Sequence, residues 1–219
     1  MRSVTIGAGC LDAYPWMKFA YCFVHGLALC DTSTYLLDQQ ATTEQYVRDN
    51  IAVLSEKAKS ISRFYRLQGE KNRSHIESLL KAIANGKTIK PVNTIVDAVM
   101  IAEMRHALLL GVHDVGTIVG DIKVDVAREG EVFSGLGGRN VVTRANEVVL
   151  RDDEGIWASY TQGPDSRTVV GAATTDAIVV GFFTPETTAE AMTRGVGDAA
   201  MILAAATRGH ADPVIVLPG

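Results

Sequence analysis

The sequence predicts a single α+β domain in which helices flank a central, mostly antiparallel sheet. Helix-type periodicity dominates the chain to about residue 110, and short strand-like segments with glycine-rich turns follow before a last helix. Grouped helices and grouped strands, rather than regular alternation, are typical of α+β proteins. The length of 219 residues suits one domain with a sizeable core. We expect residues 1–17 to be an N-terminal extension and residues 18–219 to form the domain.

The first elements follow from apolar spacing. Residues 18–29 are rich in aromatic and β-branched side chains and predict a strand with a bend near Gly26. Residues 43–66 predict a helix that stops at Gly69. Its apolar stripe recurs at steps of four and three: Val47, Ile51, Leu54, Ala58, Ile61 and Tyr65.

The next two helices have clear boundary signals. Ser74 and Glu77 form a capping box, in which the two side chains satisfy each other's free backbone donors. That helix should end at Gly86. A third helix is expected from about Thr94 to Leu110, closed by Gly111.

Strands dominate the rest of the chain. Apolar and charged residues alternate from Ile122 to Val126, as in a half-exposed strand, and Phe133 to Asn140 reads as a glycine-rich hairpin turn. Thr184-Pro185 should begin the last helix, with Thr as the cap and Pro at the first position. Further strand candidates are residues 141–150, 156–161, 177–183 and, at an edge, 213–217.

Composition favours a cytoplasmic protein. No stretch approaches the roughly 20 apolar residues of a membrane-spanning helix, so we expect no membrane partner. The run from Val4 to Gly9 is too short for a secretory signal. The three cysteines, Cys10, Cys22 and Cys30, contain no Cys-x-x-Cys pair, which predicts neither a disulfide framework nor a zinc site. Cys10 is interpreted as a small buried residue rather than a nucleophile.

Charge is unevenly distributed. Between Lys57 and Lys90 there are nine basic and two acidic residues, a net +7, so the remainder carries −11 of the total −4. Such asymmetry can mark a surface for an anionic partner, although a solvated helix face is the simpler interpretation. The RNA-binding candidates are Lys57, Lys59, Arg63, Arg66, Lys71 and Arg73.

The usual cofactor and metal motifs are missing from the sequence. Gly7-Ala8-Gly9 has no preceding strand and no third glycine, so it is not a dinucleotide fingerprint. The glycines of residues 135–138 lack the Lys and Ser/Thr of a phosphate loop. The five histidines have no metal-ligand spacing. We therefore expect no cofactor and no metal.

Residues 160–168 concentrate polar side chains between two apolar strands. A phenol, an amide, a carboxylate, a guanidinium and hydroxyls occur within nine positions, from Tyr160 to Thr168. Gly-Pro-Asp-Ser is also ordinary turn chemistry, so a turn and a site both stay open.

Four motifs together resemble a known family. They are Lys71-Asn-Arg-Ser-His-Ile-Glu-Ser-Leu-Leu80, Val92-Asn-Thr-Ile-Val-Asp97, Arg128-Glu-Gly-Glu131 and Gly163-Pro-Asp-Ser-Arg-Thr168. In this order they are similar to the B3/B4 domain of the phenylalanyl-tRNA synthetase beta subunit, and more closely to its free-standing relatives. The resemblance covers about residues 18–203. It implies a B3/B4-like α+β fold, and in the synthetase this domain hydrolyses tyrosine wrongly esterified to the phenylalanine tRNA.

The chain departs from the family pattern at three chemical positions. Met100 stands where the synthetase pattern has an asparagine, and Gly111 stands where it has a histidine. No glutamate occurs in residues 162–165, where the pattern has one. The resemblance therefore supports the fold more firmly than the editing reaction.

Candidate site residues follow from residue type and family position. Asp165 or Asp97 would orient a water molecule, and Arg167 would hold the ester or ribose, which makes these three the catalytic candidates. Substrate-binding candidates are Tyr160, Gln162, Gly163, Thr168, His113 and the amides of Gly137 and Gly138. We expect five of these side chains to converge on one cleft, with Asp97 or His113 approaching from the helical side: Tyr160, Gln162, Asp165, Arg167 and Thr168.

Three functions compete at this point. The chain would bind an aminoacylated tRNA end and hydrolyse a misacylated ester in trans. Alternatively, it is a non-catalytic RNA-binding module, or a small-molecule enzyme or binder that takes an amino acid-like ligand in the same pocket. The oligomeric state is not predictable from the sequence.

Overall fold

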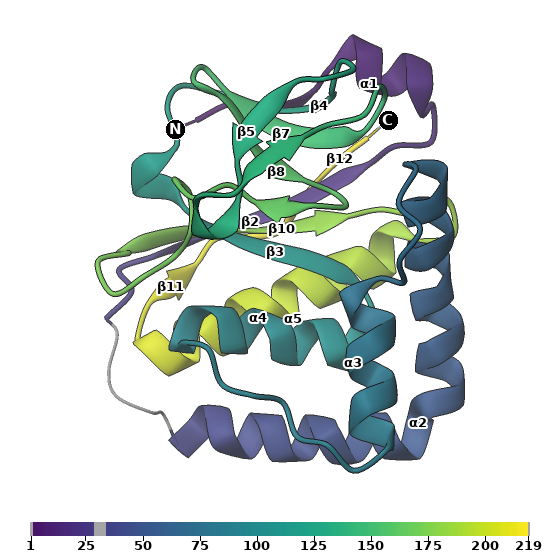
Figure 1. Ribbon diagram of the computed structural model, residues 1–219. Coiled ribbons are helices and arrows are strands. Elements are labelled where there is room, and N and C mark those ends of the chain that lie inside the picture. Colours follow the sequence, from purple (N-terminus) through teal and green to yellow (C-terminus); the bar gives the residue numbers. More distant parts are fainter. Residues whose placement is uncertain (1, 29–33, 219) are drawn as a thin grey trace.

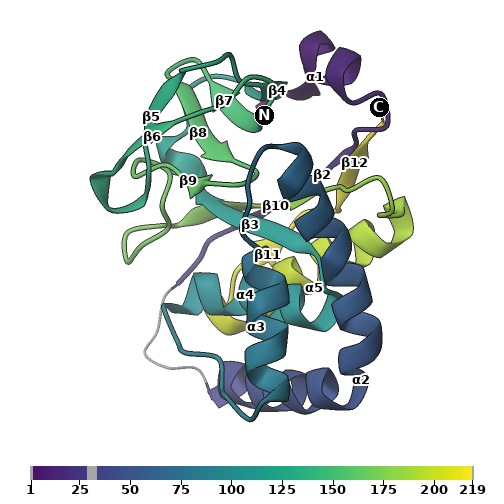
Figure 2. The ribbon, with the colours of Figure 1, turned by 45° about the vertical axis from the view of Figure 1, so that its right-hand side comes forward.

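The computed structural model describes residues 2–28 and 34–218 as one domain of packed layers (Figure 1). Helices α4 and α5 cover one face of a sheet, and a second sheet lies across the other face (Figures 1 and 2). The helices are α1 (Ala8–Ala13), α2 (Thr34–Leu67), α3 (His75–Ala84), α4 (Thr94–His106) and α5 (Ala189–Thr207).

The strands form two main sheets and one hairpin. The first sheet has the order β1 (Val4–Ile6), β4 (Ile122–Val126), β7 (Val148–Asp152), β8 (Gly155–Ser159) and β9 (Gly163–Pro164). The second has the order β11 (His210–Ala211), β2 (Phe19–His25), β10 (Asp176–Phe182) and β3 (Leu109–Asp114), and β12 (Ile215–Leu217) also pairs with β2. The hairpin joins β5 (Val132–Ser134) to β6 (Asn140–Val142).

Strand pairing confirms the predicted fold class. In the described part of the chain only β1 and β4 pair in parallel, and the other strand pairs are antiparallel. The strands divide between two sheets rather than filling one. Of the N-terminal segment, Val4–Ile6 lies beside β4, and the boundary at residue 18 stays a prediction.

Period-two alternation along β10 builds the core on both faces of the second sheet. Ile178 and Val180 pack in the cluster shared with the first sheet, whereas Ala177 and Val179 pack against α4 and α5. This strand is buried on both faces, which is why its sequence is continuously apolar.

Helix α2 is longer than predicted and is bent. It begins at Thr34 rather than Thr43, and Asn50 has non-helical backbone angles (φ −119°, ψ 17°). The Asn50 side-chain amide donates to the Tyr46 carbonyl oxygen at 2.9 Å, a side-chain bond to the preceding turn of the kind that accompanies helix bends. The two arms run in different directions (Figures 1 and 2).

Two predicted helix boundaries are wrong. Helix α4 ends at His106, where Ala107 adopts a left-handed conformation, and Leu109–Asp114 is a strand, so Gly111 lies inside β3. A short apolar run such as residues 108–110 fits a buried strand as well as a helix. Helix α5 starts at Ala189 with Thr188 as its cap, because Thr184 bonds instead with Thr187 in a preceding turn.

The cysteines are structural where they are described. Cys10 and Cys22 are buried, and burial raises the pKa of the Cys10 thiol to about 12. Cys30 and Leu29, the expected end of the first strand, lie outside the described residues. Within residues 2–28 and 34–218, none of the helices is long and apolar enough to cross a membrane.

Candidate functional site

A cavity of about 330 Å³ lies where β8 ends, and we call it the small pocket. Strand β3, the turn after β8 and the end of β10 supply most of its wall, and α2, α3 and α4 each supply one side chain. Its lining consists of Tyr65, His75, Glu103, Leu109, Leu110, Gly111, His113, Ala158, Ser159, Tyr160, Thr161, Gln162, Gly163, Pro164 and Phe182. The volume is at the lower end of the range for small-molecule sites.

Four predicted substrate-binding residues line the small pocket together. Tyr160, Gln162 and Gly163 come from the turn after β8, and His113 comes from β3. Of the five turn residues expected to share a cleft, Tyr160 and Gln162 line this pocket with His113, whereas Asp165, Arg167 and Thr168 do not.

A buried carboxylate fixes the turn that carries three of these residues. Glu147 is 1 % exposed and accepts hydrogen bonds from the hydroxyls of Ser159 and Thr161. The Ser159 hydroxyl in turn accepts from the Gln162 backbone amide at 3.0 Å. Gly163 completes the turn with φ +79°, which other residues adopt only with strain.

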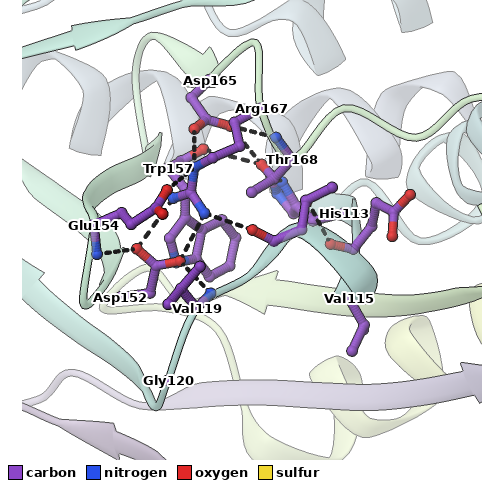
Figure 3. A network of polar contacts seen from close by, with 12 residues as sticks. His113, Val115, Val119, Gly120, Asp152, Glu154, Trp157, Asp165, Arg167 and Thr168 are labelled. Carbon is purple, nitrogen blue, oxygen red and sulfur yellow. Dashed lines mark hydrogen bonds and ion pairs between the residues drawn. The ribbon is translucent and has the colours of Figure 1, made fainter.

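His113 sits at the inner wall as a neutral imidazole. It is 3 % exposed, and burial lowers its pKa to about 3. Its Nδ1 atom lies 3.0 Å from the Thr168 hydroxyl, and its ring packs edge-on against Trp157 (Figure 3). With such a low pKa, His113 is suited to accept a hydrogen bond rather than to take up a proton.

Asp165, Arg167 and Thr168 lie behind His113, outside the small pocket. Both the backbone amide and the hydroxyl of Thr168 donate to Asp165 Oδ1, at 2.7 and 2.6 Å. Arg167 donates to both carboxylate oxygens of Asp152, at 2.9 and 3.1 Å, and to the Thr117 carbonyl oxygen (Figure 3). These three side chains are outside the lining of the small pocket and connect the loop to β7 and β3.

Asp97, Gly137 and Gly138 also lie outside the lining. Asp97 accepts from the Val92 amide at 2.8 Å, just before α4, and burial raises its pKa. Gly137 and Gly138 form the exposed tip of the β5–β6 hairpin, where the Gly138 amide already donates to Gly135.

The three lining side chains that come from helices were not predicted from the sequence: Tyr65, His75 and Glu103. Glu103 is 5 % exposed, accepts from the Leu110 amide at 3.0 Å and lies 3.3 Å from His75 Nε2. Burial lowers the pKa of His75, but the Glu103 carboxylate outweighs it and the net shift is upward. The sequence signal for Glu103 was its position as a carboxylate inside the apolar run of residues 98–104.

The Tyr160 phenol is buried and unpaired. The residue is 2 % exposed, its hydroxyl has no hydrogen-bond partner among the described residues, and burial raises its pKa well above the usual value. Its ring packs edge-on with Phe64, Tyr65 and Phe182. The aromatic side of the pocket is therefore densely packed.

A larger cavity of about 790 Å³, which we call the groove, adjoins the small pocket. Leu109 and Phe182 line both cavities. The groove runs along the second arm of α2 and the start of α5, and its floor is largely apolar. Its charged lining residues are Glu56, Lys57, Arg63, Glu186 and Arg194.

The predicted RNA-binding residues are spread along the second arm of α2 and the turn after it. Lys57 and Arg63 line the groove. Arg63 pairs with Glu186 at 3.0 Å, Lys59 with Glu56 at 2.7 Å and Arg73 with Glu77 at 3.5 Å. Arg66 and Lys71 are exposed. Over the residues that the structure describes, no three His, Cys, Asp or Glu side chains could hold a metal ion.

Comparisons with known proteins agree on one family. A model of the B3/4 domain matches residues 60–204. The chain is 31 % identical over 97 residues to a phenylalanine–tRNA ligase beta subunit of Mycoplasma genitalium, covering 44 % of this chain and 12 % of that protein. It is 28 % identical over 113 residues to the same subunit of Nitrobacter winogradskyi, covering 52 % of this chain and 14 % of that protein.

A solved structure shares the fold. An N-terminal fragment of the phenylalanyl-tRNA synthetase beta subunit of Pyrococcus horikoshii superposes with a TM-score of 0.54 at 15 % identity, over 99 % of this chain and 54 % of the fragment. The segments matched in the Mycoplasma and Nitrobacter subunits make up only about one eighth of the length of those proteins. The predicted resemblance is confirmed, because the matched domain covers most of the sequence: this chain belongs to the B3/4 domain family.

Proposed function

We propose that this chain binds the aminoacylated 3′ end of a tRNA and hydrolyses a misacylated ester in trans. The supporting observation is the arrangement of two adjoining cavities that share Leu109 and Phe182. The small pocket has the size for one amino acid, and the groove has the room for the end of a nucleotide chain. The proposal includes the cytoplasmic location that the sequence predicts.

The small pocket suits the aminoacyl group. Tyr65, Tyr160 and Phe182 offer aromatic surface, and a few polar groups, among them His113 and Gln162, can fix the orientation of a ligand. The Gln162 side-chain amide has only one long contact, 3.5 Å to the Thr161 hydroxyl, so it is available as a donor.

The groove suits the terminal nucleotides. Its apolar floor gives surface against which a base can pack, and Lys57, Arg63 and Arg194 bring positive charge to phosphates. Lys59, Arg66, Lys71 and Arg73 extend this charge along the same part of the chain.

Hydrolysis needs a positioned water and a donor for the developing oxyanion. Water adds to the ester carbonyl carbon, the bond from that carbon to the ribose oxygen breaks, and the free amino acid and the tRNA hydroxyl result. We assign Gln162 as the donor. Asp165 and Thr168 position His113. Arg167 stabilises the loop that carries these two residues, and Asp97 stabilises the start of α4.

A deacylation screen over mischarged tRNAs, with free aminoacyl esters alongside, tests the proposal. We expect release of at least one amino acid from tRNA, and Gln162→Ala should slow that release by roughly 100-fold. The matched control is Gln45→Ala on α2, an exposed glutamine that lines neither cavity and whose side chain, within the described part of the chain, bonds to Asp49 and Arg48. Protein that releases no amino acid from any charged tRNA contradicts the hydrolase.

A second candidate is a binder or enzyme for a free amino acid-like molecule. It is favoured by the acidic partners of the basic residues, since Arg63 and Lys59 are already paired with Glu186 and Glu56. In the same screen this candidate predicts turnover or binding of free esters without tRNA. Binding of tRNA without any deacylation would instead indicate a non-catalytic RNA-binding module.

A further inference from the structure

A chain of hydrogen bonds links Asp165, Thr168 and His113. Asp165 Oδ1 lies 2.6 Å from the Thr168 hydroxyl oxygen, which lies 3.0 Å from His113 Nδ1. All three residues are buried, at 5 %, 0 % and 3 % exposure. Figure 3 shows them in this order.

The protons in this chain can be assigned from the donors available. Asp165 Oδ1 already accepts the Thr168 backbone amide at 2.7 Å, and Arg167 Nε lies 3.5 Å from Oδ2, so both carboxylate oxygens face donors. The hydroxyl at 2.6 Å must therefore donate its proton to Asp165, since two lone pairs would otherwise face each other. The alternative acceptor, the Trp157 carbonyl oxygen, is farther away at 3.4 Å.

This assignment fixes the tautomer of His113. A hydroxyl has a single proton, so once Thr168 donates to Asp165 it can only accept from the imidazole. Nδ1 then carries the hydrogen of the neutral ring, and Nε2 carries a lone pair.

The lone pair lies on the pocket side of the ring. A side chain placed on Gly111 would come within 3.3 Å of His113 Nε2, and both residues line the small pocket. A Cβ atom there would also lie 3.1 Å from Val180 Cγ2, so a side chain at position 111 would crowd the ring, and glycine leaves Nε2 uncovered.

We propose that Asp165 and Thr168 are positioning residues that hold His113 in the Nδ1–H tautomer, so that Nε2 selects ligands carrying a hydrogen-bond donor. The inference rests on the proposed function, because it concerns the pocket that would take the aminoacyl side chain. A ligand that places a hydroxyl or N–H beside Nε2 satisfies that atom. A ligand with a hydrocarbon tip leaves a buried acceptor unpaired and should bind roughly tenfold more weakly.

Two measurements test the proposal. Long-range ¹H–¹⁵N correlation spectra of the free protein report the tautomer without any ligand, and His113→Phe assigns the signal. Equilibrium binding of tyrosine ethyl ester and phenylalanine ethyl ester then measures selection by a hydroxyl. We expect the Nδ1–H pattern and tighter binding of the tyrosine ester, with the preference lost in His113→Phe.

The variants at Thr168 separate positioning from packing. Thr168→Val removes the hydroxyl, so it should change the Nδ1–H pattern of His113 and abolish the preference for the tyrosine ester. Thr168→Ser keeps a hydroxyl and should keep both the pattern and the preference. Thr207→Val is the control for losing a buried hydroxyl, because Thr207 is 0 % exposed and, among the described residues, its hydroxyl donates to the Leu203 carbonyl oxygen, away from the pocket.

The outcomes are distinguishable from those of the proposed function. An Nε2–H tautomer, an unchanged signal in Thr168→Val, or equal binding of both esters overturns this inference and leaves ester hydrolysis standing. If wild-type protein binds neither ester but shows the Nδ1–H pattern, selection by Nε2 fails for aromatic ligands. Deacylation of charged tRNA then still decides the proposed function.

Discussion

At the scale of single residues, Arg167 shows how a side chain of catalytic type can be occupied structurally. Its guanidinium bridges Asp152, whose side chain is 0 % exposed, and the Thr117 carbonyl oxygen. Burial alone would raise the pKa of Asp152, but Arg167, together with the backbone amides of Val119 and Glu154, lowers that pKa below its usual value. A sequence motif records the residue types but not which partner each side chain meets.

Arg167→Ala should therefore destabilise the protein. Asp152 loses two charge-assisted hydrogen bonds while it stays buried, and we expect a loss of about 2 kcal/mol in the free energy of unfolding at pH 7. Urea denaturation measures this loss, with the exposed Arg128→Ala as control. A loss in unfolding free energy as small as that of the control would mean that Arg167 has no structural role, and it would again be a candidate site residue.

The same pair predicts a pH dependence. The folded-state pKa of Asp152 is depressed, so its contribution is fully present above the unfolded value near 4 and is lost as pH falls through the folded value. The difference in stability between wild type and Arg167→Ala should narrow in acid. A gap that stays constant down to pH 3 would contradict the assignment.

At the scale of elements, the start of α3 confirms half of the predicted capping box. The Ser74 hydroxyl accepts from the Glu77 amide at 3.3 Å, as predicted. The Ser74 amide, however, donates to the Ser62 hydroxyl at 3.0 Å, and Ser62 donates to the Glu77 carboxylate at 2.6 Å. A residue of α2 is thus inserted into the cap and ties the two helices together.

Ser74→Ala should cost about 1 kcal/mol of unfolding free energy, because the first turn of α3 loses its side-chain acceptor. Thermal or urea unfolding measures the cost. Ser78→Ala is the matched control, since Ser78 is exposed on the same helix and its hydroxyl, as far as the described residues show, donates to the Ser74 carbonyl oxygen alone. Equal effects of the two substitutions would show that the cap contributes nothing.

The elements also show what sequence patterns can and cannot predict. Segments with strict periodicity, such as α3 and β4, were predicted because one buried face imposes the spacing. The end of α4 was not predicted because it depends on two features that no local sequence signal indicates. Ala107 adopts a left-handed conformation, and the Glu103 carboxylate accepts a hydrogen bond from the Leu110 amide. Among the residues that line the small pocket, His113 and Tyr160 could be selected by residue type, whereas the place of Glu103 depends on packing between distant segments.

At the scale of the whole molecule, the groove and part of the basic segment share the second arm of α2. The second arm of α2 carries the start of the basic segment and also forms one side of the groove. The rest of the chain is acidic, so a polyanion would have one favourable approach.

If tRNA uses this approach, its affinity should fall with salt, and each phosphate contact contributes roughly 0.7–0.9 to the log–log slope. Replacing Lys57, Arg63 and Arg66 by Ala should reduce the slope by about two. The control removes the same number of exposed charges at Lys81, Lys87 and Lys90. Equal changes in both triple variants would assign the salt effect to net charge rather than to the groove.

The bend at Asn50 determines where the two arms of α2 lead. The first arm buries Leu36 in the cluster beneath the second sheet and Val47 in the cluster between the sheets, where the second arm buries Leu54 and Phe64. The first arm is also joined to α4, because Arg105 donates to the Thr43 hydroxyl. The second arm carries Tyr65 of the small pocket and Lys57 of the groove, so the angle of the bend sets the position of both residues relative to α4.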